Sequence, residues 1–354
     1  MSSYKKLINE IPLVLKRLDL NGNILDEGDL EINAFSITFP VVYGNLETKE
    51  EFYIKVPKFI FYNPEINIDT PLTQDDKALA KNEYSSLKIL QEEWPSNSKV
   101  SFVEPVAFLE GHNAIITKRI EGEFFFKLLR NSYFSFFSSQ TLSFNRASGV
   151  FRNFGSFLGM FHQSSSNNSE FNMSKYLSEI KNYLSILGEE GLEENYLNEL
   201  GSKINSVRLE SKEVNQVNCL KGIDIRQFFL LENGEIKIID PGKLFISYAE
   251  TDLARFIVTC RLLYWGTLQV LLGKTINNSL EGDFLNFYSE QNPFSKDILS
   301  LLIIKELLKQ WIVILESLHF RKWNKIFKFV YKKYYLNSFF KRLLLDEINR
   351  PKSI

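Results

Sequence analysis

The sequence predicts an α+β protein of two lobes, in which a small antiparallel β-sheet lobe with one helix precedes a larger, mostly helical lobe. Two observations predict this order. Residues 1–60 alternate apolar and polar side chains in short runs separated by turn residues, as in a meander of antiparallel strands. Beyond residue 121 the apolar residues recur with a helical period. We therefore place an N-terminal lobe at residues 1–121 and a C-terminal lobe at residues 122–354, each long enough to bury a core.

Composition narrows the class of protein. The chain is 44% apolar and 24% charged, as in a globular protein, and its net charge of −1 gives no general attraction to nucleic acid. Its two cysteines, Cys219 and Cys260, lie far apart, so a disulfide framework is not expected. No apolar run approaches eighteen residues and the first residues contain no apolar signal segment. We expect a cytoplasmic protein without a membrane span, and composition leaves its oligomeric state open.

The N-terminal lobe offers one lysine and one glutamate of interest. The strand Phe52–Val56 contains Lys55, and the helix predicted at residues 75–92 contains Glu83. Strand lysines and helix glutamates are most often simply solvated, so neither alone indicates a function. Two further strands, residues 100–108 and 114–120, flank a turn and end in Thr117-Lys118-Arg119.

The C-terminal lobe begins with a helix at residues 124–129, and the segment 130–146, rich in Ser and Phe, is expected to be an insertion or a helical lid. Residues 150–163 form a clear amphipathic helix near whose end His162 is expected to be packed rather than catalytic. A polar linker at residues 164–169 and further helices over residues 176–209 follow.

The stretch 219–242 carries the strongest signals. Two apolar runs, Phe228–Leu231 and Ile236–Ile239, flank Glu232-Asn233-Gly234, the pattern of a tight hairpin. Asp224 lies in the loop before the first run, and Asp240 directly follows the second. A carboxylate held just past a buried strand is well placed to bind a metal ion. The simpler alternative is an ordinary hairpin with turn-forming aspartates.

The order of these features resembles the protein-kinase-like superfamily, and more closely its aminoglycoside and choline kinase-like branch. The resemblance spans about residues 15–260 and continues in Glu250-Thr251-Asp252-Leu253-Ala254, where Asp252 is expected to cap a helix. It implies a bilobal protein-kinase-like fold with ATP and Mg²⁺ as cofactors. The implied activity is that of an ATP-dependent phosphotransferase acting on a hydroxyl of a small molecule or saccharide.

The same resemblance implies roles for individual residues. Lys55 would contact the α and β phosphates and be held by Glu83, and Asp240 would chelate Mg²⁺. The strand end with residues Thr117, Lys118 and Arg119 would lie at the adenine edge, where the family uses backbone groups and side chains matter little.

The catalytic loop departs from the family pattern HGDxxxxN. Without a gap, Ile223 occupies the position of the catalytic Asp and Phe228 that of the metal-binding Asn, so both chemical groups are missing. A shortened loop instead makes Asp224 the base and Gln227 the metal ligand, at a spacing of three. Arg226 would then contact an anionic acceptor or the transferred phosphate, or else pair with a loop carboxylate. The alternative to an active enzyme is a catalytically inactive, nucleotide-binding pseudokinase with a scaffold or regulatory role.

The C-terminal helices are basic and aromatic. The simplest interpretation is a packed helix with a solvated basic face; the alternative is a surface that docks on anionic lipid or an anionic glycan and associates the protein with the inner face of a membrane. The basic residues are Arg321, Lys322, Lys325, Lys328, Lys332, Lys333, Lys341 and Arg342.

Overall fold

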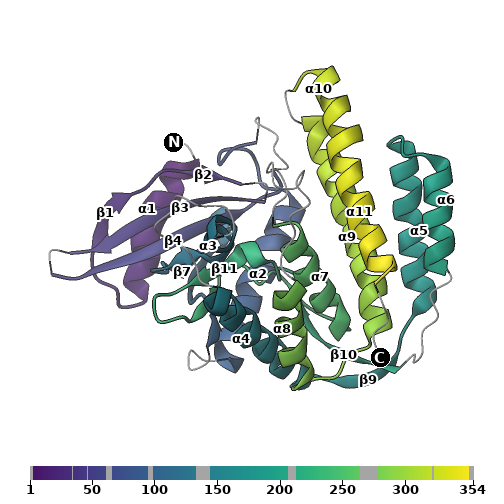
Figure 1. The fold of residues 1–354 in the computed structure, drawn as a ribbon. Coiled ribbons are helices and arrows are strands. Elements are labelled where there is room, and N and C mark those ends of the chain that lie inside the picture. Colours follow the sequence, from purple (N-terminus) through teal and green to yellow (C-terminus); the bar gives the residue numbers. More distant parts are fainter. Residues whose placement is uncertain are drawn as a thin grey trace. The chain divides into compact units, whose positions relative to one another are not determined.

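The structure is a computed structural model that describes residues 3–33, 35–45, 47–60, 66–94, 99–132, 144–205, 213–263, 278–320 and 323–350 (Figure 1). These residues form two compact units. The first contains Met1–Glu123 and Gln227–Leu244, and the second contains Phe124–Arg226 and Phe245–Ile354. Most of the segment 130–146, and the end of the helical stretch expected to reach residue 209, lie outside the described residues.

The first unit is built on an antiparallel sheet in the order β1-β3-β4-β7-β6, with β2 beside β3. This confirms the antiparallel sheet that the alternating pattern predicts. Its strands are β1 (Asn23–Glu27), β2 (Glu31–Ile32), β3 (Ser36–Gly44), β4 (Lys49–Pro57), β6 (Pro105–Leu109) and β7 (Ala114–Lys118).

The expectation that strands occupy the whole of residues 1–60 is wrong at the N-terminus, where α1 (Ser3–Arg17) is a helix. Leu7, Ile11 and Leu15 recur every four residues and are buried in one core cluster with the side chains of β3 and β4. That spacing places all three on one face of a helix. Pro12 lies inside α1 and conceals the helical pattern, because proline usually marks a turn or a helix boundary.

A second sheet has the order β5-β12-β11-β8. Its strands are β5 (Val100–Phe102), β12 (Ile236–Ile238), β11 (Phe228–Leu230) and β8 (Glu123–Phe124), and Glu123 is the last residue of the segment Met1–Glu123 of the first unit. The predicted hairpin of β11 and β12 is confirmed, with Gly234 in its turn at φ +83°. The run predicted as one strand over residues 100–108 is two strands in different sheets. β5 pairs in parallel with β12, whereas β6 pairs with β7.

The helix of the first unit is α2 (Gln74–Glu93). It begins with a capping box: the Thr73 side chain accepts from the Asp76 N–H, and the Asp76 carboxylate accepts from the Thr73 N–H. Glu83, Leu87 and Leu90 are buried on one face at spacings of three and four. Helical periodicity therefore sends Glu83 inward with the packing residues.

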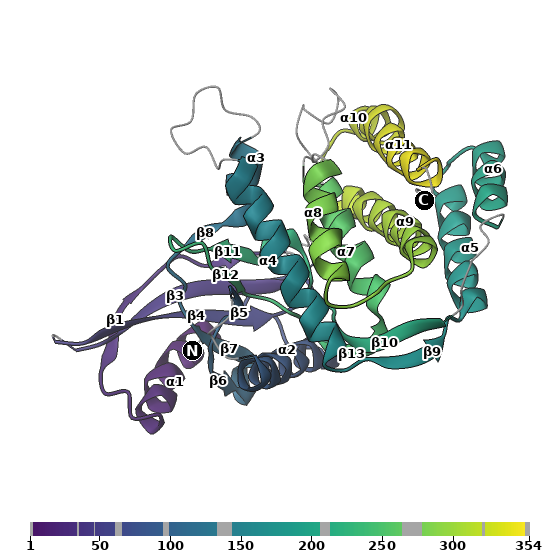
Figure 2. The same ribbon diagram turned by 60° about the horizontal axis from the view of Figure 1, so that its bottom comes forward.

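The second unit is mainly helical, as the sequence predicts. In Figure 2, α4 lies beside α8. The two helices meet through the buried rings of Phe154 in α4 and Phe284 in α8, which stack with their centroids 5.7 Å apart. Its helices are α3 (Phe125–Ser132), α4 (Phe144–Gln163), α5 (Met173–Glu189), α6 (Glu194–Asn205), α7 (Ala249–Arg261), α8 (Asn278–Ser289), α9 (Lys296–Phe320), α10 (Lys325–Val330) and α11 (Asn337–Ile348).

A third, small sheet in this unit differs from the sequence prediction. It has the order β13-β10-β9, with strands β9 (Asn167–Glu170), β10 (Glu213–Leu220) and β13 (Leu244–Tyr248). The polar stretch expected to be a linker forms β9, because its backbone pairs with β10. Polar side chains hide such a strand from an analysis of apolar alternation. Within the part of the chain that is described, no helix is long and apolar enough to cross a membrane.

Candidate active site

The ammonium group of Lys55 is the centre of the charged cluster in the first unit. Phe52 and Ile54 of β4 point into the core on the side of α1, so the intervening alternation turns Lys55 to the opposite face of the sheet. There its Nζ donates to Glu83 Oε1 at 2.7 Å and Oε2 at 2.9 Å, and to Asp240 Oδ2 at 2.7 Å. The structure thus brings together the three residues that the resemblance singled out.

Burial and charge set the protonation of this cluster. Burial alone would lower the pKa of Lys55, but the carboxylates of Asp240 and Glu83 outweigh it and raise that pKa above its ordinary value. Burial, followed by the charge of Asp240, raises the pKa of Glu83 to about 7 against the opposing effect of Lys55. Lys55 is therefore a permanent cation between two acids, and the cluster has an excess of negative charge above about pH 7, where Glu83 is ionised.

Asp240 is positioned by contacts on either side of it. The Ile239 N–H donates to the Gln227 carbonyl at 3.1 Å, and the Leu244 N–H donates to Ser86 Oγ at 3.0 Å. Between them Gly242 adopts φ +65°, a left-handed conformation that glycine tolerates without strain. Ser86 lies one helical turn after Glu83, so α2 fixes both the glutamate and the loop that follows Asp240. Sequence reasoning missed Ser86, because a single helix serine gives no signal.

The residues around Asp240 fit a hard divalent cation. The Asp240 side chain remains 28% exposed although it binds Lys55, so solvent reaches its carboxylate. The hydrogen bond from Ile239 places Gln227 beside the residue that precedes Asp240. Carboxylate and amide oxygens are the ligand types that Mg²⁺ prefers, and the surplus negative charge favours a cation here.

The strand end at residues 117–119 is bonded within the sheet. The Lys118 N–H donates to Glu104 O at 3.0 Å and the Arg119 N–H to Glu51 O at 2.9 Å. The Thr117 hydroxyl donates to Tyr53 O at 3.4 Å. The Arg119 side chain pairs with Glu51 at 2.7 Å on the surface. These four donor groups thus already have partners in the protein.

The loop with Asp224 and Arg226 belongs to the second unit. The Asp224 carboxylate accepts from the Arg226 backbone N–H at 2.8 Å and from Arg226 Nε at 2.8 Å, and it also accepts from Nη2. The Asp224 side chain is only 13% exposed and that of Arg226 is 62% exposed. Of the two roles considered for Arg226, this geometry shows the ion pair with a loop carboxylate. At the position of the family's catalytic Asp, the Ile223 side chain is fully buried.

The start of the loop is anchored by a buried polar network. Asp252 Oδ2 accepts from the Leu220 N–H at 2.8 Å and lies 3.2 Å from His162 Nε2. The Ile225 N–H donates to Thr259 Oγ1 at 3.3 Å. The expectation that Asp252 caps a helix is therefore corrected: it lies inside the first turn of α7 and its carboxylate bonds the loop and His162. Asp252 and Thr259 thus hold the two ends of the segment 220–225, which contains Asp224.

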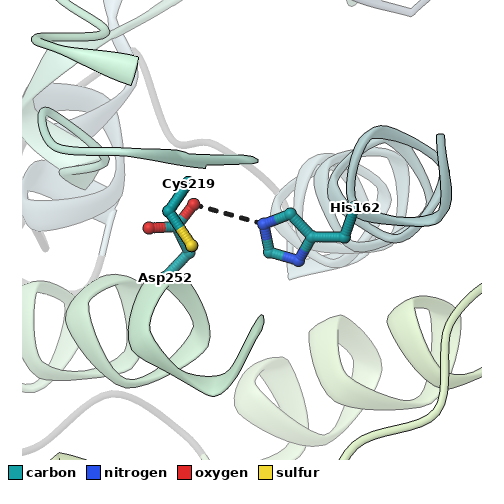
Figure 3. A group of neighbouring side chains, drawn as sticks. All are labelled: His162, Cys219 and Asp252. Carbon is teal, nitrogen blue, oxygen red and sulfur yellow. Dashed lines mark hydrogen bonds and ion pairs between the residues drawn. The ribbon is translucent and has the colours of Figure 1, made fainter. Parts of the chain in front are cut away.

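His162 is a packed structural residue, as expected. Its side chain is fully buried, and its Nδ1 lies 2.8 Å from the Tyr288 hydroxyl. Figure 3 shows the ring directed at Asp252, with Cys219 beside the carboxylate. The donor atoms of His162, Cys219 and Asp252 lie within 4.8 Å of one another, but hydrogen bonds already engage all three residues, including Cys219 Sγ to Tyr248 O at 3.5 Å. Each of the three side chains thus has a hydrogen-bond partner in the protein, although Asp252 Oδ1 is buried without one among the described residues.

Comparisons with solved structures define the class of fold. Choline kinase LicA from Streptococcus pneumoniae matches with a TM-score of 0.54 and 17% identity, over 98% of this chain and 99% of that one. A protein from Ralstonia eutropha, described as an aminoglycoside phosphotransferase, matches with a TM-score of 0.60 and 9% identity, over 96% of this chain and 95% of that one. Macrolide 2'-phosphotransferase MphH from Brachybacterium faecium matches with a TM-score of 0.53 and 9% identity, over 98% and 100%.

These matches span nearly the whole chain and confirm the fold that the motif order implies. The protein has the protein-kinase-like fold of the choline, aminoglycoside and macrolide phosphotransferases. A scan against protein-family models matched none, and a search of curated proteins found no similar sequence.

Proposed function

We propose that the protein is an ATP- and Mg²⁺-dependent phosphotransferase that acts on a hydroxyl of a small molecule or saccharide. The observation that carries the proposal is the bracketing of Lys55 by Glu83 and Asp240, at 2.7 Å from each. A lysine held in this way presents a fixed positive charge to nucleotide phosphates. Among solved structures of this fold, LicA contains AMP, an APH(2")-IIa complex contains ATP with streptomycin, and aminoglycoside 2'-phosphotransferase-IIIa contains GDP.

Each candidate site residue of the first unit has a role in this proposal. Lys55 orients the phosphates and Glu83 holds Lys55 in place. Asp240 and Gln227 hold Mg²⁺, which supplies neutralisation of the phosphate charge when it is bound. Because the N–H groups of Lys118 and Arg119 are already bonded, the adenine edge is contacted by their carbonyls or by the residues that follow them, from Ile120 onward.

In the loop, Asp224 is the group that accepts the proton of the acceptor hydroxyl. Its contact with Arg226 fixes its direction, because an arginine fork binds a carboxylate through several N–H groups at once. Arg226 is mostly exposed and is therefore also the residue best placed to meet an anionic group from solvent.

The second candidate is a catalytically inactive pseudokinase that binds nucleotide and serves as a scaffold or regulator. The specific observation in its favour is the loop itself. The position of the family's catalytic Asp is a buried isoleucine, Ile223, and the neighbouring Asp224 is engaged by Arg226. Three N–H groups of Arg226 therefore occupy the carboxylate that would have to accept the proton.

Equilibrium binding of Mg²⁺–ATP and its hydrolysis separate these functions. The variants are Lys55→Met, Asp240→Asn and Asp224→Asn, with the exposed residues Lys49→Met, on the same strand, and Asp26→Asn as matched controls. An active enzyme loses binding or turnover in all three variants and keeps both in the controls. A pseudokinase binds ATP through Lys55 and Asp240 without turnover, and Asp224→Asn changes nothing.

Absence of Mg²⁺–ATP binding by the wild-type protein would contradict the assignment of Lys55, Glu83 and Asp240 to a nucleotide site. If turnover is found, acceptors are screened next. Choline, aminoglycosides and macrolides form the first set, because the structural neighbours are described as acting on them, and simple saccharides form the second.

A further inference from the structure

The residues between α9 and α11 form an exposed apolar and basic surface in the second unit. We call residues 323–334 the tip; they comprise Trp323, Asn324, α10 and the first part of a π-helical turn, Tyr331–Leu336. In Figure 1, α10 lies at the far end of the paired helices α9 and α11. None of the residues of α10 is buried, so the tip adds no side chain to the core.

Large apolar side chains are concentrated on the tip. Of seventeen such residues with more than about a third of their surface exposed in the described part of the chain, five lie within nine consecutive positions. They are Ile326 at 74%, Phe327 at 53%, Phe329 at 60%, Val330 at 45% and Tyr334 at 64%. Single exposed apolar residues are ordinary, but a contiguous group marks a surface that meets an apolar partner.

The spacing of these residues makes them one face. Ile326, Phe329, Val330 and Lys333 follow at intervals of three, four and seven from the first, which is the repeat of a single helical face. Exposed lysines border the apolar side chains: Lys325 begins the helix, and Lys333 Nζ lies over the rings of Phe329 and Tyr334 at 5.7 Å and 5.6 Å. The face is therefore apolar and cationic at once.

The tip is ordered by its own side chains. The Trp323 ring contacts those of Phe327 at 5.0 Å and Tyr331 at 5.2 Å, and Tyr331 stacks on Tyr335 at 4.9 Å. Asn324 caps α10 by accepting from the Ile326 N–H at 2.9 Å. These ring contacts lie on the neighbouring side of the helix and leave Ile326, Phe329 and Val330 exposed.

The helix beyond the tip behaves differently. Lys341 lies 4.3 Å from the centre of the Tyr196 ring and Phe340 stacks on Trp311 at 5.4 Å, while near the end of the tip Lys332 pairs with Glu190 at 2.6 Å. These contacts attach the later residues to α5, α6 and α9. The interpretation of the basic C-terminal segment as a packed helix therefore describes α11, but it does not describe the exposed apolar residues of the tip.

The positive charge of the tip and its surroundings indicates the kind of partner that it meets. Between Glu316 and Asp346 the sequence contains eight basic and no acidic residues, although the whole chain has a net charge of −1. Exposed aromatic and aliphatic side chains beside lysines match an anionic bilayer, whose head groups attract the lysines and whose acyl boundary takes up the apolar groups. We propose that the tip docks on the surface of an anionic lipid bilayer.

Co-sedimentation of the full chain with unilamellar vesicles tests this proposal. The vesicles are phosphatidylcholine alone or phosphatidylcholine with phosphatidylglycerol. The variants are Ile326→Ser with Phe329→Ser, and Lys325→Gln with Lys333→Gln. The control combines Ile246→Ser with Lys181→Gln, an exposed apolar residue and an exposed lysine of the same unit outside the tip. Circular dichroism and the thermal unfolding midpoint confirm that every variant folds.

The expected result is binding to the anionic vesicles that falls at high salt. Loss of the two lysines should weaken it about thirtyfold at low ionic strength. The apolar pair should weaken it at least as much, and the control should bind like the wild type. No binding to anionic vesicles overturns the proposal. Undiminished binding of the Ile326→Ser with Phe329→Ser variant to anionic vesicles also overturns it, because the surface would then bind an anionic polymer through charge alone. So does a wild-type dimer that Ile326→Ser with Phe329→Ser dissociates, because a second copy would then cover the face.

Discussion

The Nζ of Lys55 lies 2.7 Å from Oδ2 of Asp240, although 185 residues separate them in the sequence. The contact joins the central strand β4 to the loop after β12 within one unit. Lys55 thus donates hydrogen bonds to Asp240 as well as to Glu83. The contact therefore fixes the loop after β12 against β4.

The first prediction concerns the coupling between Lys55 and Glu83. Replacing Lys55 by Met leaves the Glu83 carboxylate, whose side chain is 4% exposed, without its cation. Above the Glu83 pKa of about 7, removing one partner of this buried ion pair costs about 3–5 kcal/mol, so the free energy of unfolding at about pH 8.5 should fall by that order, whereas at lower pH protonation of Glu83 reduces the loss. In a Glu83→Gln background the same replacement should cost much less, because no buried charge is stranded. Urea denaturation of the four proteins measures the difference.

The exposed lysine of an ordinary surface pair provides the control. Lys203→Met, which removes the partner of Glu199 on α6, should hardly change the free energy of unfolding. If Lys55→Met costs the same with Glu83 and with Gln at position 83, the two side chains are not coupled and the described geometry is not maintained in solution.

The second prediction concerns the close approach of α4 and α8. A Cβ at Gly155 would lie 2.3 Å from the backbone oxygen of Phe284, so Gly155→Ala must push the two helices apart. We expect a loss of about 1–3 kcal/mol, typical of overpacking a tight interior. Gly149→Ala is the matched control in the same helix, because its Cβ would meet nothing within 4 Å. It should stabilise the protein by roughly 0.5–1 kcal/mol. Equal effects of the two substitutions would contradict the observed packing.

Much of the site follows from local patterns in the sequence. Strand alternation places Lys55, helical spacing places Glu83, and the hairpin around Gly234 places Asp240, so these three residues are predictable from neighbouring residues alone. The contacts that hold them are not. Ser86 binds the Leu244 N–H across 158 residues, and Asp252 binds the Leu220 N–H across 32. Such hydrogen bonds depend on the tertiary structure, and a single polar residue in the sequence does not predict them.

The parts of the fold that were predicted wrongly have physical reasons of the same kind. The helix α1 contains Pro12 and begins a chain segment whose later residues alternate, so its four-residue spacing was overlooked. The strand β9 is polar along its length and owes its conformation to pairing with β10. In both cases the tertiary environment decides between local alternatives.

The third prediction concerns acid stability. Glu281 in α8 accepts from Arg261 Nη2 at 2.9 Å and from Arg350 Nη1 at 2.5 Å. Burial alone would raise its pKa, but the two arginines outweigh it and lower the pKa of Glu281 below its ordinary value of 4.5. A carboxyl group whose pKa is lower in the folded state stabilises the protein above its unfolded pKa. That contribution is lost as the pH falls through the folded pKa.

Glu281→Gln should therefore lower the free energy of unfolding at pH 7 by about 1.5–3 kcal/mol, because the buried Arg261 loses one of its two carboxylate partners and keeps only Glu347. The gap between wild type and variant should narrow as the pH falls below about 4.5. Thermal unfolding at several pH values between 7 and 3.5 measures it. The exposed Glu199→Gln is the control and should show almost no gap at any pH. A gap that stays constant or widens in acid would refute the role given to this carboxylate.

The fourth prediction concerns the two cysteines. Cys219 is fully buried and Cys260 is 5% exposed, and burial raises the pKa of both thiols well above the ordinary value. Nearby carboxylates, Asp252 for Cys219 and Glu281 for Cys260, raise the pKa further because they oppose a second negative charge. Only the thiolate reacts with a disulfide reagent, so both cysteines should be inert in the folded protein.

Titration of the native protein with a chromogenic disulfide reagent at pH 8 should therefore release almost no product, and unfolding in denaturant should release two equivalents, one for each cysteine in the sequence. Ser185→Cys, at an exposed position of α5, provides the matched control and should add one fast-reacting thiol. Rapid modification of a native cysteine would mean that Cys219 or Cys260 reaches solvent. For Cys219 that result would also mean that the network of His162 and Asp252 opens, and with it the anchor of the loop that leads to Asp224.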